Sequence, residues 1–436
     1  MSDLAPLSLR ERLAARDPAS EVLPGVSTAA LRASVEGLPA HVAGVVLRDL
    51  DPASFVRALV ALDGRAESLV LAPPGTDAAV QADYAARARC AHQVATLEDL
   101  AHLPAAPGEA APTRWVLATS GTTAAPKLVG HTLASLTRST RTDVARGAGL
   151  RWGLLYDPTR YAGLQVVLQA LLGGSTLLAP PLAAPLPERV SALARDGCTH
   201  LSATPTLWRR VLMTPASASL PLRQITLGGE IADQALLDRL SATFPEARVA
   251  HIFASTEAGV GFSVTDGKAG FPRRYLEEPP RGVALRVREG RLFVKNTRVL
   301  GAYLGEEDST FRDAEGFVDT GDAVEVRGDR VLFLGRASGV INVGGQKVHP
   351  ERVEAVLLAH PGVAAVRVGQ RRSPITGALV TAEVTPAPGA AAGALKRELR
   401  AHCAALLAPH ERPALVRLSG ALRMSPAGKL VREVAP

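Results

Sequence analysis

The chain contains the segment Thr119-Ser120-Gly121-Thr122-Thr123-Ala124-Ala125-Pro126-Lys127, in which four hydroxyl side chains and a glycine are followed by a lysine. The apolar run Arg114–Ala118 before it predicts a buried strand, and the sequence from about Leu133 predicts a helix. Such a loop suits a polyphosphate, because backbone N–H groups, hydroxyl donors and an ammonium can all point at phosphate oxygens. The segment therefore predicts a nucleotide-binding protein. It does not match Gly-x-x-x-x-Gly-Lys-Ser/Thr, which disfavours a P-loop NTPase.

Length and composition indicate a globular protein with more than one domain. The 436 residues are too many for one ordinary core, and 47% hydrophobic with 21% charged residues is a normal globular balance. The N-terminus lacks the basic and apolar regions of a signal peptide, and no apolar run is long enough to span a bilayer. We therefore expect a cytoplasmic protein without a membrane span.

The charge balance is mildly basic. Lys and Arg number 49 against 42 Asp and Glu, which gives a formal net charge of +7. No basic run is interleaved with aromatic residues, so nucleic-acid binding is not indicated. The excess suits an anionic small molecule, although general surface charge explains it equally well. Cys90, Cys198 and Cys403 lie far apart without metal-site spacing, which predicts reduced, buried thiols.

The order of predicted elements divides the chain into a large and a small domain. Strand and helix signals alternate to about residue 260, which predicts layered α/β subdomains. Short alternating strands with tight turns follow over 282–334 and predict a β-rich subdomain. The pattern breaks at 335–339, and the remaining sequence mixes helices and strands. The predicted fold class is α/β, with an N-terminal domain over 1–336 and a small, mobile α+β C-terminal domain over 337–436.

Further polar clusters follow the predicted strands. They are Gly228-Gly229-Glu230, Phe253-Ala254-Ser255-Thr256-Glu257, Val318-Asp319-Thr320-Gly321-Asp322, Gly335-Arg336, Val343-Gly344-Gly345-Gln346-Lys347-Val348 and Met424-Ser425-Pro426-Ala427-Gly428-Lys429. In this order and spacing they resemble the adenylate-forming superfamily, which includes acyl-CoA synthetases, aryl acid–CoA ligases and peptide-synthetase adenylation domains. The resemblance covers roughly residues 113–430 and suggests a compact stand-alone member.

The resemblance implies how ATP would be bound. The loop 119–127 would hold the β- and γ-phosphates, and Gly228-Gly229-Glu230 would lie along the adenine. Asp322 would accept hydrogen bonds from both ribose hydroxyls, and Arg336 would also reach the ribose. The implied nucleotide-binding residues are Thr119, Ser120, Gly121, Thr122, Thr123, Lys127, Gly228, Gly229, Glu230, Asp322 and Arg336.

The resemblance also implies the catalytic groups. Glu257 would bind Mg²⁺, Thr256 would contact the α-phosphate, and Lys429 would bridge the substrate carboxylate and the α-phosphate. A carboxylate attacking a phosphate brings two anions together, and the metal and the ammonium would offset their repulsion. A Thr-Glu pair alone could be a helix cap, and a lone lysine is more often solvated. The order of the clusters favours the catalytic interpretation.

Members of this superfamily run two half-reactions. A carboxylate and ATP first form an acyl-adenylate with loss of pyrophosphate, and the thiol of CoA or of a carrier-protein phosphopantetheine then attacks it. The resemblance implies that the C-terminal domain swings about a hinge at 336–338 between the steps. The swing would remove Lys429 and bring Gly344 and Gly345 to the thiol channel, where glycines let a pantetheine arm approach the backbone.

The segment 156–163 departs from the family pattern, because the histidine usual in this region is missing. The aspartate, the arginine and the two tyrosines of this segment suggest a small polar or aromatic carboxylic acid as the substrate. Arg160 is an equally good candidate for a plain surface charge. The residues predicted to line the substrate pocket are Tyr156, Arg160, Tyr161 and Gly163.

Two other functions remain open. The altered pocket, together with Ser338 where the hinge often has Asp or Lys, allows an adenylate-forming enzyme with an unusual nucleophile such as nitrite, as in aryl-amine diazotisation. A nucleotide-binding homologue without turnover is the other, and the presence of Lys429, Glu257 and Asp322 disfavours it. The leading hypothesis is an AMP-forming acid–thiol ligase.

Overall fold

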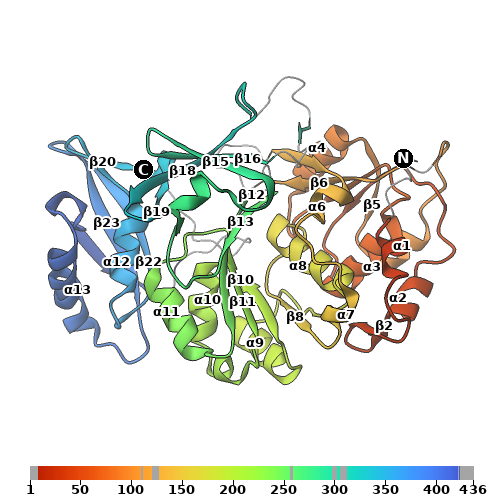
Figure 1. Cartoon of the computed structure of the whole chain (residues 1–436), viewed down its shortest axis with the longest axis horizontal. Helices are drawn as coiled ribbons and strands as arrows, with labels where there is room; N and C mark the ends of the chain where they lie inside the picture. Colours follow the sequence, from red (N-terminus) through yellow and green to blue (C-terminus); the bar gives the residue numbers. More distant parts are fainter. Residues whose placement is uncertain are drawn as a thin grey trace.

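A computed structural model describes residues 8–109, 111–119, 127–255, 259–296, 302–304, 312–420 and 422 of the protein. The sheets follow one another across the molecule, from the red and orange N-terminal part to the blue C-terminal part (Figure 1). In the part of the chain that the structure describes, no helix is long and apolar enough to cross a membrane.

The first sheet belongs to the N-terminal part of the chain. Its strand order is β17 (Ala302–Tyr303), β7 (Leu128–His131), β6 (Arg114–Ala118), β4 (Ser68–Leu71), β3 (Gly44–Leu47) and β5 (Cys90–Val94). Strands β3, β4, β5 and β6 are parallel, and β3 and β4 are buried along their whole length because both faces of the sheet are covered. Around it lie β1 (Glu21–Leu23), β2 (Val26–Ser27), α1 (Leu9–Leu13), α2 (Thr28–Ala33), α3 (Pro52–Leu62), α4 (Ala78–Ala88) and α5 (Leu97–Ala101).

The second sheet has the order β13 (Gly259–Val264), β12 (Arg248–Ser255), β11 (Gln224–Gly228), β10 (His200–Ala203), β8 (Arg151–Leu154) and β9 (Thr176–Leu178). All of its strands are parallel except β13, which runs antiparallel to β12. Its carboxyl ends therefore share one edge, where ligands gather in open α/β sheets. The helices of this part are α6 (Leu133–Leu136), α7 (Val144–Gly147), α8 (Tyr161–Leu172), α9 (Leu186–Arg195), α10 (Pro205–Leu212) and α11 (Gln234–Thr243).

The third sheet is antiparallel, with the order β14 (Phe271–Pro272), β19 (Arg330–Arg336), β18 (Val318–Arg327), β16 (Arg291–Asn296) and β15 (Val283–Arg288). An aromatic cluster joins it to the second sheet, because Phe253 of β12 stacks on Phe333 of β19 with ring centroids 5.6 Å apart. The third sheet is thereby held beside the carboxyl end of β12, from which Phe253 projects.

The C-terminal part has its own hydrophobic core. Its elements are β20 (Ile341–Val343), β21 (Gln346–Val348), α12 (Pro350–Leu358), β22 (Val363–Ser373), β23 (Gly377–Pro386), α13 (Ala392–Leu406) and β24 (Leu415–Leu418). Buried apolar residues from Ile341 to Val416 form one cluster that contains no residue from earlier in the chain. This part lies at one end of the molecule (Figure 1).

The predicted fold class is confirmed, and the helix predicted from about Leu133 is present, but an unpredicted strand precedes it. The structure places β7 directly after the segment 119–127, so this segment connects two antiparallel strands, not a strand and a helix. The helix α6 does begin at Leu133, but it has only four residues. Hydroxyl groups at Thr132, Ser135 and Thr137 bond to nearby backbone groups, and such bonds compete with helix continuation.

Candidate active site

The predicted phosphate loop begins and ends at a closed pair of strands. Thr119 N donates to Lys127 O at 2.8 Å, just beyond the last ladder pair of β6 and β7, Ala118 with Leu128. Thr119 is buried. The predicted loop residues Ser120, Gly121, Thr122 and Thr123 lie outside the described residues.

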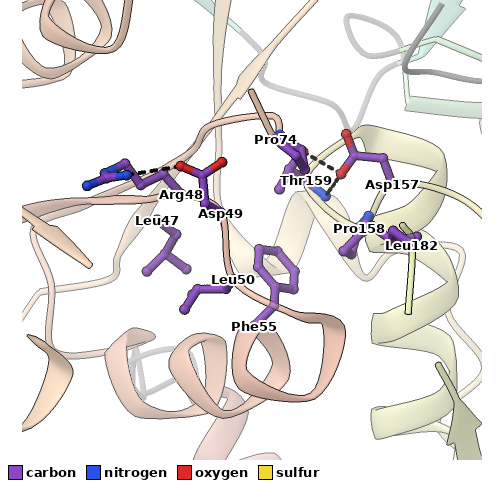
Figure 2. Close-up of a pocket in the computed structure, with 10 residues that line it drawn as sticks. All are labelled: Leu47, Arg48, Asp49, Leu50, Phe55, Pro74, Asp157, Pro158, Thr159 and Leu182. Atoms are coloured by element: carbon purple, nitrogen blue, oxygen red, sulfur yellow. Dashed lines mark hydrogen bonds and ion pairs between the residues drawn. The ribbon is translucent and has the colours of Figure 1, made fainter. Parts of the chain in front are cut away.

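A tight turn follows β8 and leads into α8. Asp157 Oδ1 accepts from Thr159 N at 2.9 Å and from Thr159 Oγ1 at 2.7 Å. Figure 2 shows this turn opposite the loop that follows β3. Residues of both line a cavity of about 10 Å³. A cavity of this size has room for about one water molecule and is too small for a substrate.

The two polar pocket candidates of this turn reach neighbouring strand ends. Arg160 Nη1 donates to the backbone O of Ala118 at 3.1 Å, and Arg160 Nε lies 3.9 Å from Asp157 Oδ2. Burial raises the pKa of Asp157. The hydrogen bonds from Thr159 and the charge of Arg160 act in the opposite direction and lower this pKa. Arg160 thus binds the protein backbone at the start of the predicted phosphate loop.

Gly163 meets a packing requirement in the first turn of α8. A Cβ at this position would lie 2.1 Å from the backbone O of Asp157 and 2.9 Å from Pro158 Cα. The absence of a side chain allows α8 to pack directly on the turn 157–159.

The two tyrosines of the predicted pocket connect the turn to the second sheet. Tyr156 is buried, and burial together with the nearby carboxylate of Glu230 raises its pKa. Burial also raises the pKa of Tyr161, opposed by a hydrogen bond to the backbone of Val260 in β13. Tyr156 is therefore near the predicted site residue Glu230, and Tyr161 links α8 to β13.

Gly228 and Gly229 lie at the carboxyl end of β11, followed by Glu230. Gly229 has a φ of 80°, a left-handed conformation that favours glycine, and it is exposed. Glu230 Oε2 accepts from Thr206 N at 2.9 Å, in the first turn of α10. The turn is thus fixed by a carboxylate at a helix N-terminus, where a negative charge is favourable.

The two residues predicted to bind the ribose lie side by side on neighbouring strands of the third sheet. Asp322 of β18 is the ladder partner of Arg336 of β19, and Arg336 Nε lies 3.3 Å from Asp322 Oδ1. Arg336 also donates to the backbone O of Thr320. Burial raises the pKa of Asp322, and the charge of Arg336 partly offsets this rise. The Asp322 side chain is 17% exposed, so its carboxylate is within reach of a ligand.

Gly344 and Gly345 form the exposed turn between β20 and β21. Their φ values are 58° and 87°, and Gly344 N donates to Thr376 O at 2.8 Å. No heavy atom of the described residues lies within 4 Å of a Cβ built on either glycine. Among the described residues, the two glycines therefore have open space on their Cβ side, and their place in a thiol channel stays a prediction.

The remaining predicted groups fall outside the described residues. They are Thr256, Glu257 and Lys429. Among the described residues, no group of three or more His, Cys, Asp or Glu side chains could hold a metal ion. The predicted magnesium ligand Glu257 stays a prediction.

The sequence prediction counted Asp157 among the polar residues of the segment 156–163 without giving it a role, and it did not point to Thr206. The Asp157 carboxylate is buried beside Arg160, and the Thr206 amide fixes Glu230. The sequence Asp157-Pro158-Thr159 does carry a signal, because Asp followed two residues later by a hydroxyl residue is typical of a turn closed by the aspartate. Nothing in the local sequence points to Thr206.

The sequence matches the AMP-binding enzyme family over residues 35–297 and the AMP-binding enzyme C-terminal domain over residues 352–429. The chain belongs to the AMP-binding enzymes. The predicted family is therefore confirmed. The first match covers the second sheet, all of the first sheet except β17, and the strands β14, β15 and β16 of the third sheet, and the second match covers most of the C-terminal part.

Two relatives of this AMP-binding enzyme are named as ligases. A fatty acid–[acyl-carrier-protein] ligase of Streptomyces coeruleorubidus is 29% identical over 346 residues, which cover 72% of this chain and 65% of that protein. A probable 2-succinylbenzoate–CoA ligase of Mycobacterium tuberculosis is 31% identical over 313 residues, which cover 67% of this chain and 76% of that protein. The chain spans less than two thirds of the length of several relatives that it matches.

Solved structures of AMP-binding enzymes share this fold. The o-succinylbenzoate CoA synthetase of Bacillus subtilis, in complex with its acyl-adenylate intermediate, matches with a TM-score of 0.73 and 20% identity. The match covers 97% of this chain and 96% of that chain. The arrangement of α/β sheets, β-rich sheet and small C-terminal part is therefore that of known adenylate-forming enzymes.

Proposed function

We propose that the protein is an AMP-forming ligase that joins a small polar or aromatic carboxylic acid to a thiol. A carboxylate oxygen attacks the α-phosphorus of ATP, pyrophosphate leaves, and an acyl-adenylate forms. The sulfur of CoA or of a carrier-protein phosphopantetheine then attacks the acyl carbon, a thioester forms, and AMP leaves. The acid, the acceptor and a cytoplasmic location remain predictions.

One continuous path of contacts supports this proposal. Arg160 joins the end of β6 to the start of α8, and Tyr161 joins α8 to β13. The stacked rings of Phe253 and Phe333 continue the path from β12, the neighbour of β13, to β19. Arg336 at the end of β19 then reaches Asp322. Contacts thereby link Arg160, Tyr161, Phe253 and Asp322, which belong to separate segments of the chain, and this linkage supports a shared nucleotide site.

The roles proposed for individual residues are those that the family resemblance implies. Asp322 would accept the ribose hydroxyls, with Arg336 holding its orientation, and Gly228-Gly229-Glu230 would contact the adenine. The loop from Thr119 to Lys127 would hold the phosphates, and Thr256 the α-phosphate. Glu257 would hold Mg²⁺, whose charge offsets that of the phosphates. Lys429 would supply the cation that bridges the carboxylate and the α-phosphate.

We also propose that residues 337–436 form a mobile domain with its hinge at 336–338. The separate hydrophobic cluster of this part supports the division. Its contact surface with α10 and α11 holds a cavity of about 140 Å³, lined on the C-terminal side by small and apolar residues such as Pro361 and Ala387. An interface with such a gap is loosely packed, as expected of surfaces that separate during a reaction cycle.

Tyr156, which is buried, and Tyr161, which is partly buried, support a small aromatic or polar acid. Tyr156 and Tyr161 offer flat apolar faces together with hydroxyl groups, which suit a ring that carries polar substituents. Relatives and structures named for 2-succinylbenzoate and anthranilate act on acids of this kind.

Acid-dependent exchange of labelled pyrophosphate into ATP tests the proposal. The folded protein is incubated with ATP, Mg²⁺, labelled pyrophosphate and a panel of aryl and short-chain acids. Exchange that requires one of the acids is expected, and Lys429→Ala should reduce it strongly. No exchange with any acid, or an unchanged rate in Lys429→Ala, would contradict the proposal. AMP release that requires nitrite and an aryl amine and ignores CoA would instead favour the diazotisation alternative.

A further inference from the structure

The buried pair Asp157 and Arg160 is not explained by binding of a substrate. The Asp157 side chain is 7% exposed and that of Arg160 is 25% exposed. Among the described residues, neither Asp157 Oδ2 nor Arg160 Nε has a hydrogen-bond partner, and the two atoms lie 3.9 Å apart. A buried carboxylate is costly unless a cation compensates it, so the two side chains depend on each other.

The turn that carries the pair fixes the direction of the arginine. Asp157 Oδ1 holds Thr159 through two hydrogen bonds, drawn as dashed lines in Figure 2, and Arg160 N donates to the backbone O of Asp157 at 3.2 Å. Arg160 then occupies the N-cap position of α8 in an extended conformation. The hydrogen bonds of the turn therefore fix the backbone from which the Arg160 side chain projects.

The backbone O of Ala118, which accepts the hydrogen bond from Arg160, lies at the last residue of β6. The parallel pairing of β4 with β6 ends at Leu117, so Ala118 is paired only on its β7 side. Arg160 Nη1 supplies the hydrogen bond to Ala118 O beyond the end of β4. The next residue, Thr119, carries the last backbone bond of the β6–β7 hairpin, to Lys127.

The chemistry of this position suits arginine better than lysine. A guanidinium is a planar fork, so one nitrogen can donate to a carbonyl while another faces a carboxylate. An ammonium on a flexible stem would hold one of these partners and lose the geometry of the other. The hydrogen bond from Arg160 to Ala118 joins α8 to the first sheet. The two residues are 42 positions apart in the sequence.

We propose that Arg160 is a positioning residue, which fixes the end of β6 at Ala118 and Thr119 for nucleotide binding, and that Asp157 orients it. The nucleotide part of this inference rests on the proposed function. The inference changes the expected role of Arg160, because it acts through the backbone of β6 and not through a contact with the acid.

Two measurements test the inference with the full chain. The first is hydrogen exchange of the peptides that cover Thr119 and β7, which needs no catalysis. The second is the Kd for ATP with Mg²⁺ in the absence of acid, compared with the KM for the acid. The variants are Arg160→Gln, Arg160→Lys and Asp157→Asn, with Arg146→Gln as the control because Arg146 is exposed and only pairs with Asp143.

In Arg160→Gln we expect faster exchange at Thr119 and an ATP Kd weakened by about tenfold, as for the loss of one charge-assisted hydrogen bond. The KM for the acid should stay within about twofold by the same reasoning. Arg160→Lys and Asp157→Asn should change both readouts in the same direction and by less, and Arg146→Gln should match the wild type.

Wild-type exchange at Thr119 together with a wild-type ATP Kd in Arg160→Gln would overturn the inference. A change confined to the KM for the acid would do the same and would restore Arg160 as a substrate contact. If Arg160→Gln does not fold, Arg160→Lys decides on the same readouts. If the proposed function fails because no acid supports pyrophosphate exchange, the hydrogen-exchange result still tests the link to Ala118.

Discussion

Asp322 and Arg336 occupy opposed positions on β18 and β19, and Arg336 Nε lies 3.3 Å from Asp322 Oδ1. The two strands meet in a hairpin whose turn, Arg327 to Arg330, lies at the far end of the ladder from this pair. The guanidinium is the more exposed partner, at 59% against 17% for the aspartate side chain. The carboxylate is therefore paired with a cation that solvent still reaches.

Removing this carboxylate should weaken nucleotide binding specifically. Asp322→Ala is expected to raise the Kd for ATP by about 10- to 100-fold, because a hydrogen bond to a charged group contributes about 1.5–3 kcal/mol. The matched control is Asp329→Ala, an exposed aspartate in the turn of the same hairpin. Equilibrium binding of ATP by calorimetry checks the prediction, and equal affinity in the two variants would contradict it.

The raised pKa of Asp322 predicts a dependence of stability on pH. Burial raises this pKa above 3.8, so the folded state binds the proton more tightly than the unfolded state. Stability should therefore fall as pH rises through the folded pKa, because the carboxyl must then ionise in a buried position. Asp322→Asn removes this contribution. Denaturant unfolding should show that Asp322→Asn gains stability relative to the wild type as pH rises from about 3 to 7. An unchanged difference in stability, or a difference that changes in the opposite direction, would contradict the prediction.

Gly163 should not tolerate a side chain. A Cβ there would lie 2.1 Å from the backbone O of Asp157, so Gly163→Ala is expected to destabilise the fold by about 1–3 kcal/mol, as overpacking does. Gly393→Ala is the control, because this glycine is in helix α13 and no atom lies within 4 Å of its Cβ position. That substitution should be neutral or stabilising by up to about 1 kcal/mol. Thermal unfolding measures both, and equal effects would contradict the packing account.

Asp63 connects three elements in the first part of the chain and should be essential to its stability. Its carboxylate accepts from Leu9 N at 2.7 Å and from Trp115 Nε1 at 2.8 Å. Asp63→Ala would leave two buried donors without an acceptor, at a cost of about 1–3 kcal/mol each. Denaturant unfolding should show a loss of at least about 2 kcal/mol by this reasoning. Asp83→Ala, which removes only an exposed pair with Arg87, should change stability by less than about 0.5 kcal/mol.

The net positive charge of the chain lies wholly in its C-terminal part. Residues 337–436 carry 13 Lys and Arg against 6 Asp and Glu, whereas residues 1–336 carry 36 of each. Both CoA and carrier proteins are anionic, so we expect this charge to assist the thiol step. The double variant Arg371→Gln/Arg372→Gln should raise the KM for the thiol substrate a few-fold at low salt and leave pyrophosphate exchange unchanged. An equal loss in both half-reactions would contradict this division of roles.

Much of the architecture could be predicted because it follows local periodicity. The alternating strands and helices predicted to about residue 260 form the first two sheets with their helices, and the short strands predicted over 282–334 contribute to the antiparallel third sheet. Apolar runs and turn residues specify such elements without help from distant contacts. The strands β7 and β24 were not predicted, because each is four residues long and gains its identity from pairing with β6 and β23.

The site was predictable in composition but not in its contacts. The ordered clusters identified the family, which the matches over 35–297 and 352–429 confirm. The link from Arg160 to Ala118 and that from Glu230 to Thr206 were not predictable, because each joins segments whose approach is set by tertiary packing. Gly163 shows the same limit: its sequence position suggested a pocket, and its neighbours show a packing requirement.

A crystal structure of the protein with a non-hydrolysable acyl-adenylate analogue tests the central claim most directly. We expect both ribose hydroxyls within hydrogen-bond distance of the Asp322 carboxylate, the adenine beside Gly228-Gly229-Glu230, and the acyl group near Tyr156. A nucleotide bound elsewhere, with Asp322 still paired only to Arg336, would contradict the account.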